Sequence, residues 1–269
     1  MESKNKMSAY DRVLTARKKN RPLITDYIEA LFDDFIEIKG DRLSGEDESI
    51  YGGIAMFNGT PVTVIGHRKG RTTEDNLKYN FGMTSPAGYR KAVRLMKQAE
   101  KFKRPVITFV DTPGAYPGME AEANGQSTAI AESIAATITL KVPVITIITG
   151  EGSSGGALAI AAADSVWMLK NAIYSILSPE GFASIIWKDA KRASEASEIM
   201  KITSDDLLEY GLIDGILPEG KNCFMAISRM LASELNRLSK LSGSALVAER
   251  YKKYRNIEGS YKPVNTKKG

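Results

Sequence analysis

The chain has 269 residues, of which 43% are hydrophobic and 26% are charged, and its net charge is +5; this is the composition of an ordinary globular protein. The single cysteine, Cys223, excludes an internal disulfide and any zinc site built from several cysteines. No apolar stretch is long enough to span a membrane, and residues 1–22 lack the apolar core of a secretory signal, so we expect a cytoplasmic protein without membrane contact.

The positive charge is concentrated at the two ends of the chain and in two interior segments, residues 66–71 and 89–104. One interpretation is solvated surface, and this is our expectation for the ends. The other is a surface for polyanions, either nucleic acid or a phosphorylated molecule such as coenzyme A. No motif for RNA or DNA binding supports the nucleic-acid version.

The first hundred residues predict helices, a loop and a hairpin. Residues 23–34 have the spacing of an amphipathic helix, residues 40–52 form a polar loop, and residues 54–66 predict a β-hairpin that turns at Asn58-Gly59. Residues 68–85 predict a long ordered loop with a short helix.

Pro86 is expected to open the next helix, because proline suits the first helical position. An apolar stripe on this helix is assigned to the core: Tyr89, Ala92, Val93, Met96 and Ala99. The opposite face carries the basic residues Arg90, Lys91, Arg94, Lys97 and Lys101.

A short pattern then recurs. PVITFVDTPG begins at Pro105 and PVITIITGEG at Pro143, which is 38 residues later. Continuous Val/Ile runs are typical of parallel strands that are buried on both faces. The spacing fits strand–helix–strand turns of a right-handed coil.

The second half continues the alternation of strands and helices. It predicts strands at 165–169 and 172–177, a helix at 178–187 capped by Ser178, helices at 189–200 and 203–210, a strand at 213–217 and helical structure over 221–255. No linker divides the chain. We therefore expect a basic segment over 1–21, one domain over 22–255 and a polar tail over 256–269.

Residues 152–156 match the G-x-S-x-G pattern of a hydrolase nucleophile turn. A serine nucleophile needs a base, and α/β-hydrolases place the histidine after the serine. Here the single histidine, His67, precedes Ser154 by 87 residues. We therefore expect Ser154 to cap the following helix instead.

Residues 150–155 also match the G-x-G-x-x-G fingerprint of dinucleotide-binding proteins. That fingerprint requires an acidic residue about 20 positions later to hold the ribose. Asp164 is too close and Glu180 is too far. The dinucleotide-binding interpretation of residues 150–155 is therefore set aside.

A more general chemistry remains for this glycine-rich turn. Backbone N–H groups at the start of a helix stabilise negative charge, and paired glycines at 155 and 156 let a carbonyl approach closely. If the charge develops during a reaction, the turn is an oxyanion hole.

The segments DTPGAYPG (111–118) and GEGSSGGALAIAAAD (150–164) resemble the carboxyltransferase branch of the crotonase-like enzymes. The full set of segments, in order, resembles the carboxyltransferase alpha subunits of bacterial acetyl-CoA carboxylase over residues 22–255. The further segments are GHRKGR (66–71), NFGMTSPAGYRKAVRLMKQAEKF (80–102), GQS (125–127), SPEGFASIIWKD (178–189) and GLIDGILPE (211–219).

This resemblance implies an α/β crotonase-like fold, a spiral of strand–strand–helix units. It implies transfer of a carboxyl group from carboxybiotin to acetyl-CoA, which gives malonyl-CoA for fatty acid biosynthesis. The implied partners are a beta subunit in an α2β2 assembly, the biotin carboxyl carrier protein and a biotin carboxylase that uses ATP. The family's zinc element belongs to the beta partner, so no metal is expected on this chain.

The resemblance also assigns residues. The N–H groups of Gly155, Gly156 and Ala157 are expected to hold the ureido oxygen of biotin, and Gly114 and Ala115 to line the same pocket. Three cations are assigned either to anionic substrate or to solvated surface: Arg68, Lys69 and Arg71.

Three further positions complete this comparison. Asp111 and Pro113 are expected to shape their turn. Ser153 stands where the family usually has glycine, so the turn is expected to differ there if it requires a positive φ.

Three alternatives stay open at this point. The chain acts on a different acyl-CoA, or it is a crotonase-type hydratase that uses Glu120 and Glu122, or it is a module that binds nucleic acid through its basic helix and tail. Hydration of an enoyl-CoA by the isolated chain would indicate the second. Binding that falls steeply with salt would indicate the third.

Overall fold

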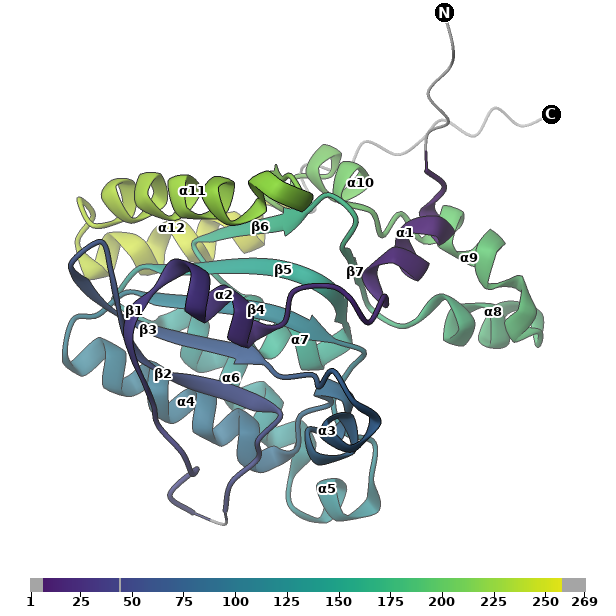
Figure 1. The fold of residues 1–269 in the computed structure, drawn as a ribbon, viewed down its shortest axis with the longest axis horizontal. Helices are drawn as coiled ribbons and strands as arrows, with labels where there is room; N and C mark the ends of the chain where they lie inside the picture. The colour runs from purple at the N-terminus through teal and green to yellow at the C-terminus, as the bar shows by residue number, and fades with distance from the viewer. Residues whose placement is uncertain (1–6, 44, 258–269) are drawn as a thin grey trace, which may run out of the picture.

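The computed structural model describes residues 7–43 and 45–257, and in this part of the chain eight strands form one mixed sheet (Figure 1). The strands are β1 (Asp33–Glu37), β2 (Ile50–Phe57), β3 (Thr60–His67), β4 (Val106–Thr112), β5 (Val144–Ser153), β6 (Ser165–Leu169), β7 (Ile173–Ser175) and β8 (Gly215–Leu217). Their order in the sheet is β1-β2-β3-β4-β5-β6-β8. Strand β7 also pairs with β5.

Strands β1 to β3 pair antiparallel, and the sheet is parallel from β3 onward. The predicted hairpin is confirmed, with Asn58 and Gly59 at positive φ between β2 and β3. The two PVIT segments are neighbouring parallel strands, and Val106 pairs with Val144. Residues 106–110 of β4 therefore pair with residues of β5 that lie 38 positions later in sequence, which is the spacing of the two PVIT segments.

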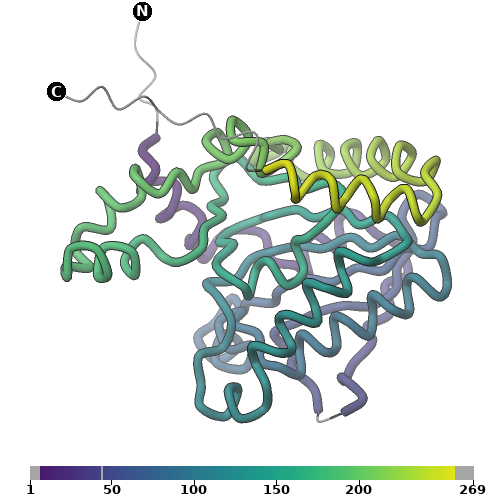
Figure 2. The backbone as a smooth tube through the Cα atoms, turned by 180° about the vertical axis from the view of Figure 1, so that it is seen from behind, coloured from purple at the N-terminus to yellow at the C-terminus, as the bar shows by residue number. Residues whose placement is uncertain are grey.

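Helices cover both faces of the sheet. They are α1 (Ala9–Ala16), α2 (Ile24–Leu31), α3 (Thr73–Lys78), α4 (Pro86–Lys101), α5 (Met119–Ala123), α6 (Gln126–Thr139), α7 (Ser154–Ala161), α8 (Pro179–Trp187), α9 (Ala193–Met200), α10 (Ser204–Glu209), α11 (Cys223–Leu238) and α12 (Gly243–Arg255), with short 3-10 turns at Asn80–Gly82, Ala190–Arg192 and Gly220–Asn222. Helices α2 and α11 lie on one face, and α4, α6, α7 and α12 on the other (Figures 1 and 2). Among the described residues, no helix combines the length and the apolar character needed to cross a bilayer.

Helix α4 shows how the sequence directs this packing and where the prediction fails. It begins at Pro86, and most of its expected apolar stripe is buried, including Tyr89 and Met96. Lys91, however, is wholly buried rather than on an exposed basic face. Its ammonium group contacts the Glu46 carboxylate and donates to the carbonyl of Ile50 at 2.7 Å.

Two further differences concern helix boundaries. The helix expected at 23–34 ends at Leu31, because the chain passes directly into β1. The helical stretch expected at 221–255 is two helices that break at 239–242. The expected tail lies outside the described residues from 258 onward.

Helix α1 forms where the sequence predicts only a basic segment. Its N-cap Ser8 accepts from the N–H of Asp11, and Val13 and Ala16 pack against Ile173 and Ile202. The first described residues are therefore packed against the second half of the chain, next to α8 and α9 (Figure 1).

Candidate functional site

Two glycine-containing turns meet at one edge of the sheet. Strands β4 and β5 run parallel, so both end at the same edge, and Thr112 pairs with Gly152 as the last matched residues. The chain leaves β4 through the 113–118 turn and leaves β5 directly into α7. The sheet thus brings together two segments that lie 40 residues apart in sequence.

Gly156 is the point of closest approach between these turns. A β-carbon built on Gly156 would lie 2.6 Å from the backbone nitrogen of Ala115 and 2.7 Å from the carbonyl carbon of Gly114. Both distances are shorter than any ordinary contact, so only glycine fits at 156. Gly114 has a φ of +145°, and its N–H and C=O both bond to the hydroxyl of Thr112, at 3.1 and 2.7 Å.

The start of α7 has a constrained backbone. Ser154 has a φ of +58°, which is uncommon for a residue with a side chain. Ser153 instead has an extended φ of −123°, so the serine in the family's glycine position needs no positive φ. The expected cap is also absent, because Ser154 is the first residue of the helix and the side chain of the N-cap residue, Ser153, makes no capping hydrogen bond.

The first N–H groups of an α-helix have no partner within the helix, and they carry the positive end of its dipole. In α7 these groups belong to the residues from Ser154 to Ala157. Gly156 and Ala157 are buried, whereas Gly155 is partly exposed. The structure therefore places Gly156 against Gly114 and Ala115, with Gly155 and Ala157 beside it in the same helical turn. The role of these five residues stays a prediction.

A mostly apolar pocket of about 640 Å³ adjoins this turn. Ser154, Gly155 and Leu158 form its α7 side. The remaining lining comes from β7 and from the helices α8 to α10 and the segments around them: Tyr174, Ser175, Ile176, Phe182, Met200, Lys201, Ile202, Leu207, Tyr210 and Leu212. Its volume is that of a typical small-molecule site.

The three cations assigned from the sequence have defined partners. Lys69 lies 2.6 Å from Asp111, and Arg71 bonds to Asp26 at 2.5 Å. The guanidinium of Arg68 lies between two aromatic rings, 4.6 Å from the Tyr51 centroid and 4.2 Å from the Tyr79 centroid. Lys69 is the one that lies beside the β4 turn.

Asp111 links the ends of three strands. It accepts from Lys69, which follows β3, and from the backbone N–H of Glu151 at 3.0 Å. Gly150 packs against the same carboxylate, since a β-carbon there would lie 2.3 Å from its Oδ1 atom. These contacts agree with the expected role of Asp111 in shaping the turn.

Sequence analysis missed the contribution of the N-terminal segment. Arg17 pairs with Glu151 at 2.7 Å and with Glu180 at 2.8 Å, so it joins α1 to the end of β5 and to α8. Arg21 donates to the carbonyl of Thr149 at 2.6 Å. The basic run RKKNR was the available signal, but its partners lie more than 120 residues later.

A smaller pocket of about 280 Å³ lies between this segment and the β4 turn. Its lining includes Arg17, Arg21 and Lys69, together with Asp111 and Pro113. Two further lysines, Lys18 and Lys19, line it as well. Its surroundings are therefore strongly basic.

His67 ends β3 and is 2% exposed. Burial lowers its pKa to about 4, an effect that Lys69 reinforces and Asp111 opposes. The ring is therefore neutral at pH 7, and no hydrogen bond in the described chain joins it to Ser154. This geometry gives the serine-nucleophile interpretation no base.

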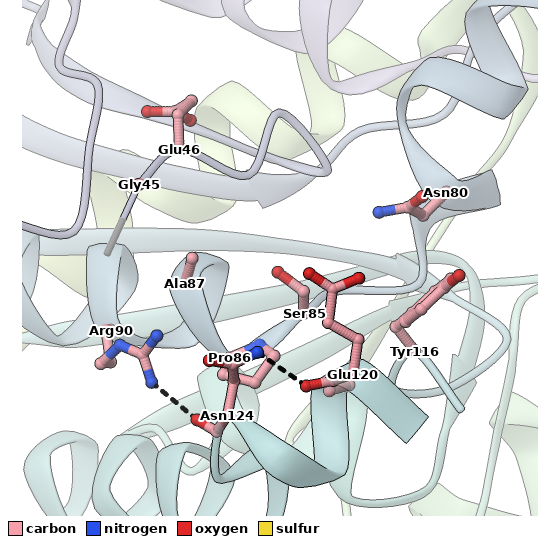
Figure 3. Close-up of a pocket in the computed structure, with 11 residues that line it drawn as sticks. Gly45, Glu46, Asn80, Ser85, Pro86, Ala87, Arg90, Tyr116, Glu120 and Asn124 are labelled. Atoms are coloured by element: carbon pink, nitrogen blue, oxygen red, sulfur yellow. Dashed lines mark hydrogen bonds between the residues drawn. The ribbon is translucent and has the colours of Figure 1, made fainter. Parts of the chain in front are cut away.

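The hydratase alternative depends on Glu120 and Glu122. Both lie on the exposed helix α5. Glu120 projects into a separate polar pocket of about 350 Å³, beside Ser85 and Tyr116 (Figure 3). Neither carboxylate lines the pocket that contains Gly155.

No cluster of three or more acidic, histidine or cysteine side chains that could hold a metal ion occurs in residues 7–43 or 45–257. The edge of the sheet offers backbone N–H groups, the positive end of a helix dipole and nearby cations.

Comparison with known proteins agrees with the resemblance. Residues 2–258 match the family described as acetyl co-enzyme A carboxylase carboxyltransferase-like. The chain is 53% identical over 265 residues to the acetyl-coenzyme A carboxylase carboxyl transferase subunit alpha of Clostridium acetobutylicum, which covers 96% of this chain and 97% of that relative. It is 52% identical over 267 residues to the carboxyl transferase subunits beta/alpha of Clostridium tetani, covering 96% of this chain and 46% of that longer protein.

A solved structure is also similar. The transcarboxylase 12S structure, determined with methylmalonyl-coenzyme A and methylmalonic acid bound, aligns with a TM-score of 0.71 and 20% sequence identity. The alignment covers 86% of this chain and 44% of that chain, so this chain spans less than half of that structure. The similarity confirms the expected crotonase-like fold.

Proposed function

The chain belongs to the acetyl co-enzyme A carboxylase carboxyltransferase-like family, and from this premise we propose that its two glycine turns form the biotin side of a carboxyltransferase site. The chain is an alpha subunit that takes part in the carboxylation of acetyl-CoA. The observation that carries the proposal is the contact of Gly156 with Gly114 and Ala115 at the start of α7.

The reaction moves one carboxyl group. The bond between the biotin ureido nitrogen and the carboxyl carbon breaks, and a bond forms between that carbon and the methyl carbon of acetyl-CoA. The released nitrogen takes the proton that the methyl group loses, so malonyl-CoA and biotin are the products. Negative charge develops on the ureido oxygen and on the thioester oxygen, and N–H groups stabilise such oxyanions.

The residues of this chain fit the ureido group on steric grounds. Gly155 and Gly156 present no side chain, and the pocket beside Gly155 is large enough for a small bicyclic ring. We assign the N–H groups of Gly155, Gly156 and Ala157 to the ureido oxygen. Removing one donor of this kind typically costs about 2.7–4 kcal/mol of transition-state stabilisation.

The second turn and the cations receive supporting roles. Gly114 and Ala115 would close the pocket against α7. Lys69, beside Asp111, is the cation best placed to face an anionic substrate, whereas Arg68 and Arg71 would order the loop that precedes α3.

Partners complete the proposed site. The beta/alpha relative contains both subunits in one chain, which supports a beta-subunit partner for this chain. We propose that the beta subunit binds acetyl-CoA in an α2β2 assembly. Biotin would arrive on a separate carrier protein, after carboxylation by an ATP-dependent biotin carboxylase.

A reconstituted carboxyl-transfer assay tests the proposal. The chain is mixed with a matching beta subunit, acetyl-CoA and carboxylated carrier protein, and malonyl-CoA is measured with each subunit omitted in turn. We expect product only when both subunits are present. A stable complex without product would indicate a different acyl-CoA, and product from the isolated chain would contradict a shared site.

A further inference from the structure

Helix α1 lies against the helices α8 to α10, which form one wall of the apolar pocket beside Gly155 (Figure 1). The backbone N–H of Ala9, in the first turn of α1, donates to the carboxylate of Glu198 on α9 at 2.7 Å. Arg12, one turn later, donates to the carboxylate of Asp205 on α10 at 2.7 Å. The N-terminal helix is therefore bonded to two of the three helices of this wall.

The apolar side of α1 packs against residues of the same wall. Val13 and Ala16 form a buried cluster with Ile173 and Ile202, and Met200 packs against this cluster. Met200 and Ile202 also line the pocket. Helix α1 therefore contacts pocket-lining residues through apolar packing as well as through hydrogen bonds.

Arg17, the residue that follows α1, joins the two sides of the pocket. Its Nε and Nη2 atoms donate to the carboxylate of Glu151 on β5, at 3.2 and 2.7 Å. Its Nη1 atom donates to the carboxylate of Glu180 on α8, at 2.8 Å. Strand β5 leads into the turn with Gly155, and the pocket-lining Phe182 lies two residues after Glu180. One guanidinium group thus connects both walls.

Helix α8 has few other anchors to the body of the protein. It lies beyond the edge of the sheet, next to α9 (Figures 1 and 2). Two of its nine residues are buried, Pro179 and Ala183. Segments with few buried contacts have low local stability, so a single polar link has a large influence on their position.

The ion pair between Arg17 and Glu180 contributes little to the stability of the whole chain. Its side chains are 31% and 37% exposed, and pairs with this exposure change the free energy of unfolding only slightly. Its effect is local, because it sets how far α8 lies from the end of β5. Loss of the pair therefore changes the pocket rather than the fold.

We propose that Arg17 and Glu180 are positioning residues: they hold α8 at the distance from β5 at which the pocket fits the biotin of the carboxylated carrier protein. This inference rests on the proposed function, which places biotin beside Gly155. Without the ion pair, α8 occupies a wider range of positions, and the carrier binds only the fraction of molecules in which α8 is in place. Affinity for the carrier falls, whereas the N–H groups of α7 keep their geometry.

Glu180→Ala tests the inference, because it removes the link to α8 and leaves Arg17 paired with Glu151. We expect KM for the carboxylated carrier in the alpha–beta complex to rise about 2-fold to 5-fold, the size of effect expected from losing a partly exposed ion pair. The kcat, the KM for acetyl-CoA and the Tm should stay unchanged. A lower Tm with an unchanged KM for the carrier would overturn the inference.

Glu195→Ala is the matched control. Glu195 also lies in the first turn of a helix, α9, and its carboxylate forms an exposed ion pair with Arg192 at 2.7 Å. This pair lies within one short segment and does not connect the two walls of the pocket. Glu195→Ala should therefore have the wild-type KM for the carrier. An equal rise in KM in Glu180→Ala and Glu195→Ala would overturn the inference.

A double-mutant cycle tests whether the two residues act through each other. The assays are run at a temperature at which circular dichroism shows that every variant is folded. The variant with both Arg17→Ala and Glu180→Ala should have the KM of Arg17→Ala alone, and additive effects would overturn the inference. If the wild-type complex transfers no carboxyl group, the proposed function fails; if it does and Glu180→Ala matches it, the inference alone fails.

Discussion

The guanidinium of Arg17 lies 2.7 Å from the carboxylate of Glu151, a residue three positions before Ser154. The Glu151 side chain is only 5% exposed, while that of Arg17 is 31% exposed. The pair therefore connects the end of α1 to strand β5, which leads directly into the candidate site at the start of α7.

Replacing Arg17 with alanine should destabilise the fold. The change leaves a buried carboxylate without its partner, which costs about 1–3 kcal/mol. Urea unfolding followed by circular dichroism measures the free energy of unfolding. Lys39→Ala is the control, because Lys39 and Glu37 form a more exposed pair at 3.8 Å whose loss should cost less than about 1 kcal/mol. Equal losses would contradict a bracing role for Arg17.

Gly156→Ala should impair carboxyl transfer while the fold persists. Its methyl group would overlap the backbone of Ala115, so one of the two turns must move. We expect a loss of about 1–3 kcal/mol in stability and of about 100-fold in kcat. Gly45→Ala is the control, because a β-carbon there has no atom within 4 Å. Normal turnover by Gly156→Ala would refute the oxyanion assignment.

His67 should make stability depend on pH in a defined direction. Burial lowers its pKa to about 4, from 6.5, so the unfolded chain binds the proton more tightly than the folded one. The contribution of neutral His67 to the free energy of unfolding is therefore complete above pH 6.5, and it is lost as the pH falls towards 4. Between pH 7 and pH 5 the loss should be about 2 kcal/mol.

Urea unfolding of the wild type and of His67→Gln at both pH values isolates this contribution. The buried histidine should make the wild type lose more stability than the variant on acidification, since the carboxylates titrate in both proteins. The same loss in both would show that the histidine is not held neutral in the fold.

Lys91→Met should destabilise the chain although it replaces a lysine in a predicted basic face. It removes the donor to the Ile50 carbonyl and leaves Glu46 without its cation, at a cost of about 1–3 kcal/mol. Lys97→Met on the same helix is the control, because Lys97 is exposed and should change stability by less than about 0.5 kcal/mol. Thermal unfolding gives the Tm of both variants. A Lys91→Met variant with an unchanged Tm would contradict the stabilising role of Lys91.

Local patterns allowed most of the fold to be predicted. The PVIT recurrence indicated parallel strands, and the structure pairs Val106 with Val144. Asn58-Gly59, Pro86 and Ser178 each mark a turn or a helix start that the structure contains. These signals succeed because turn and cap geometry depends on a few neighbouring residues.

Features that depend on distant partners could not be predicted. Lys91 has the spacing of an exposed residue, but Glu46 and the Ile50 carbonyl approach it from another part of the chain. His67 was considered only as a catalytic base, and its burial at the end of β3 follows from the pairing of that strand with β2 and β4. The oxyanion assignment of Gly155 and Gly156 remains a prediction.

The docking of α1 also bears on how the protein is made. Arg12 bonds to Asp205, 193 residues later, and Arg21 bonds to Glu219, 198 residues later. A ribosome that adds about 5–20 residues per second needs about 10–40 s to supply such partners. Helix α1 is therefore synthesised well before its docking partners, and during that interval its apolar side, with Val13 and Ala16, is available to chaperones.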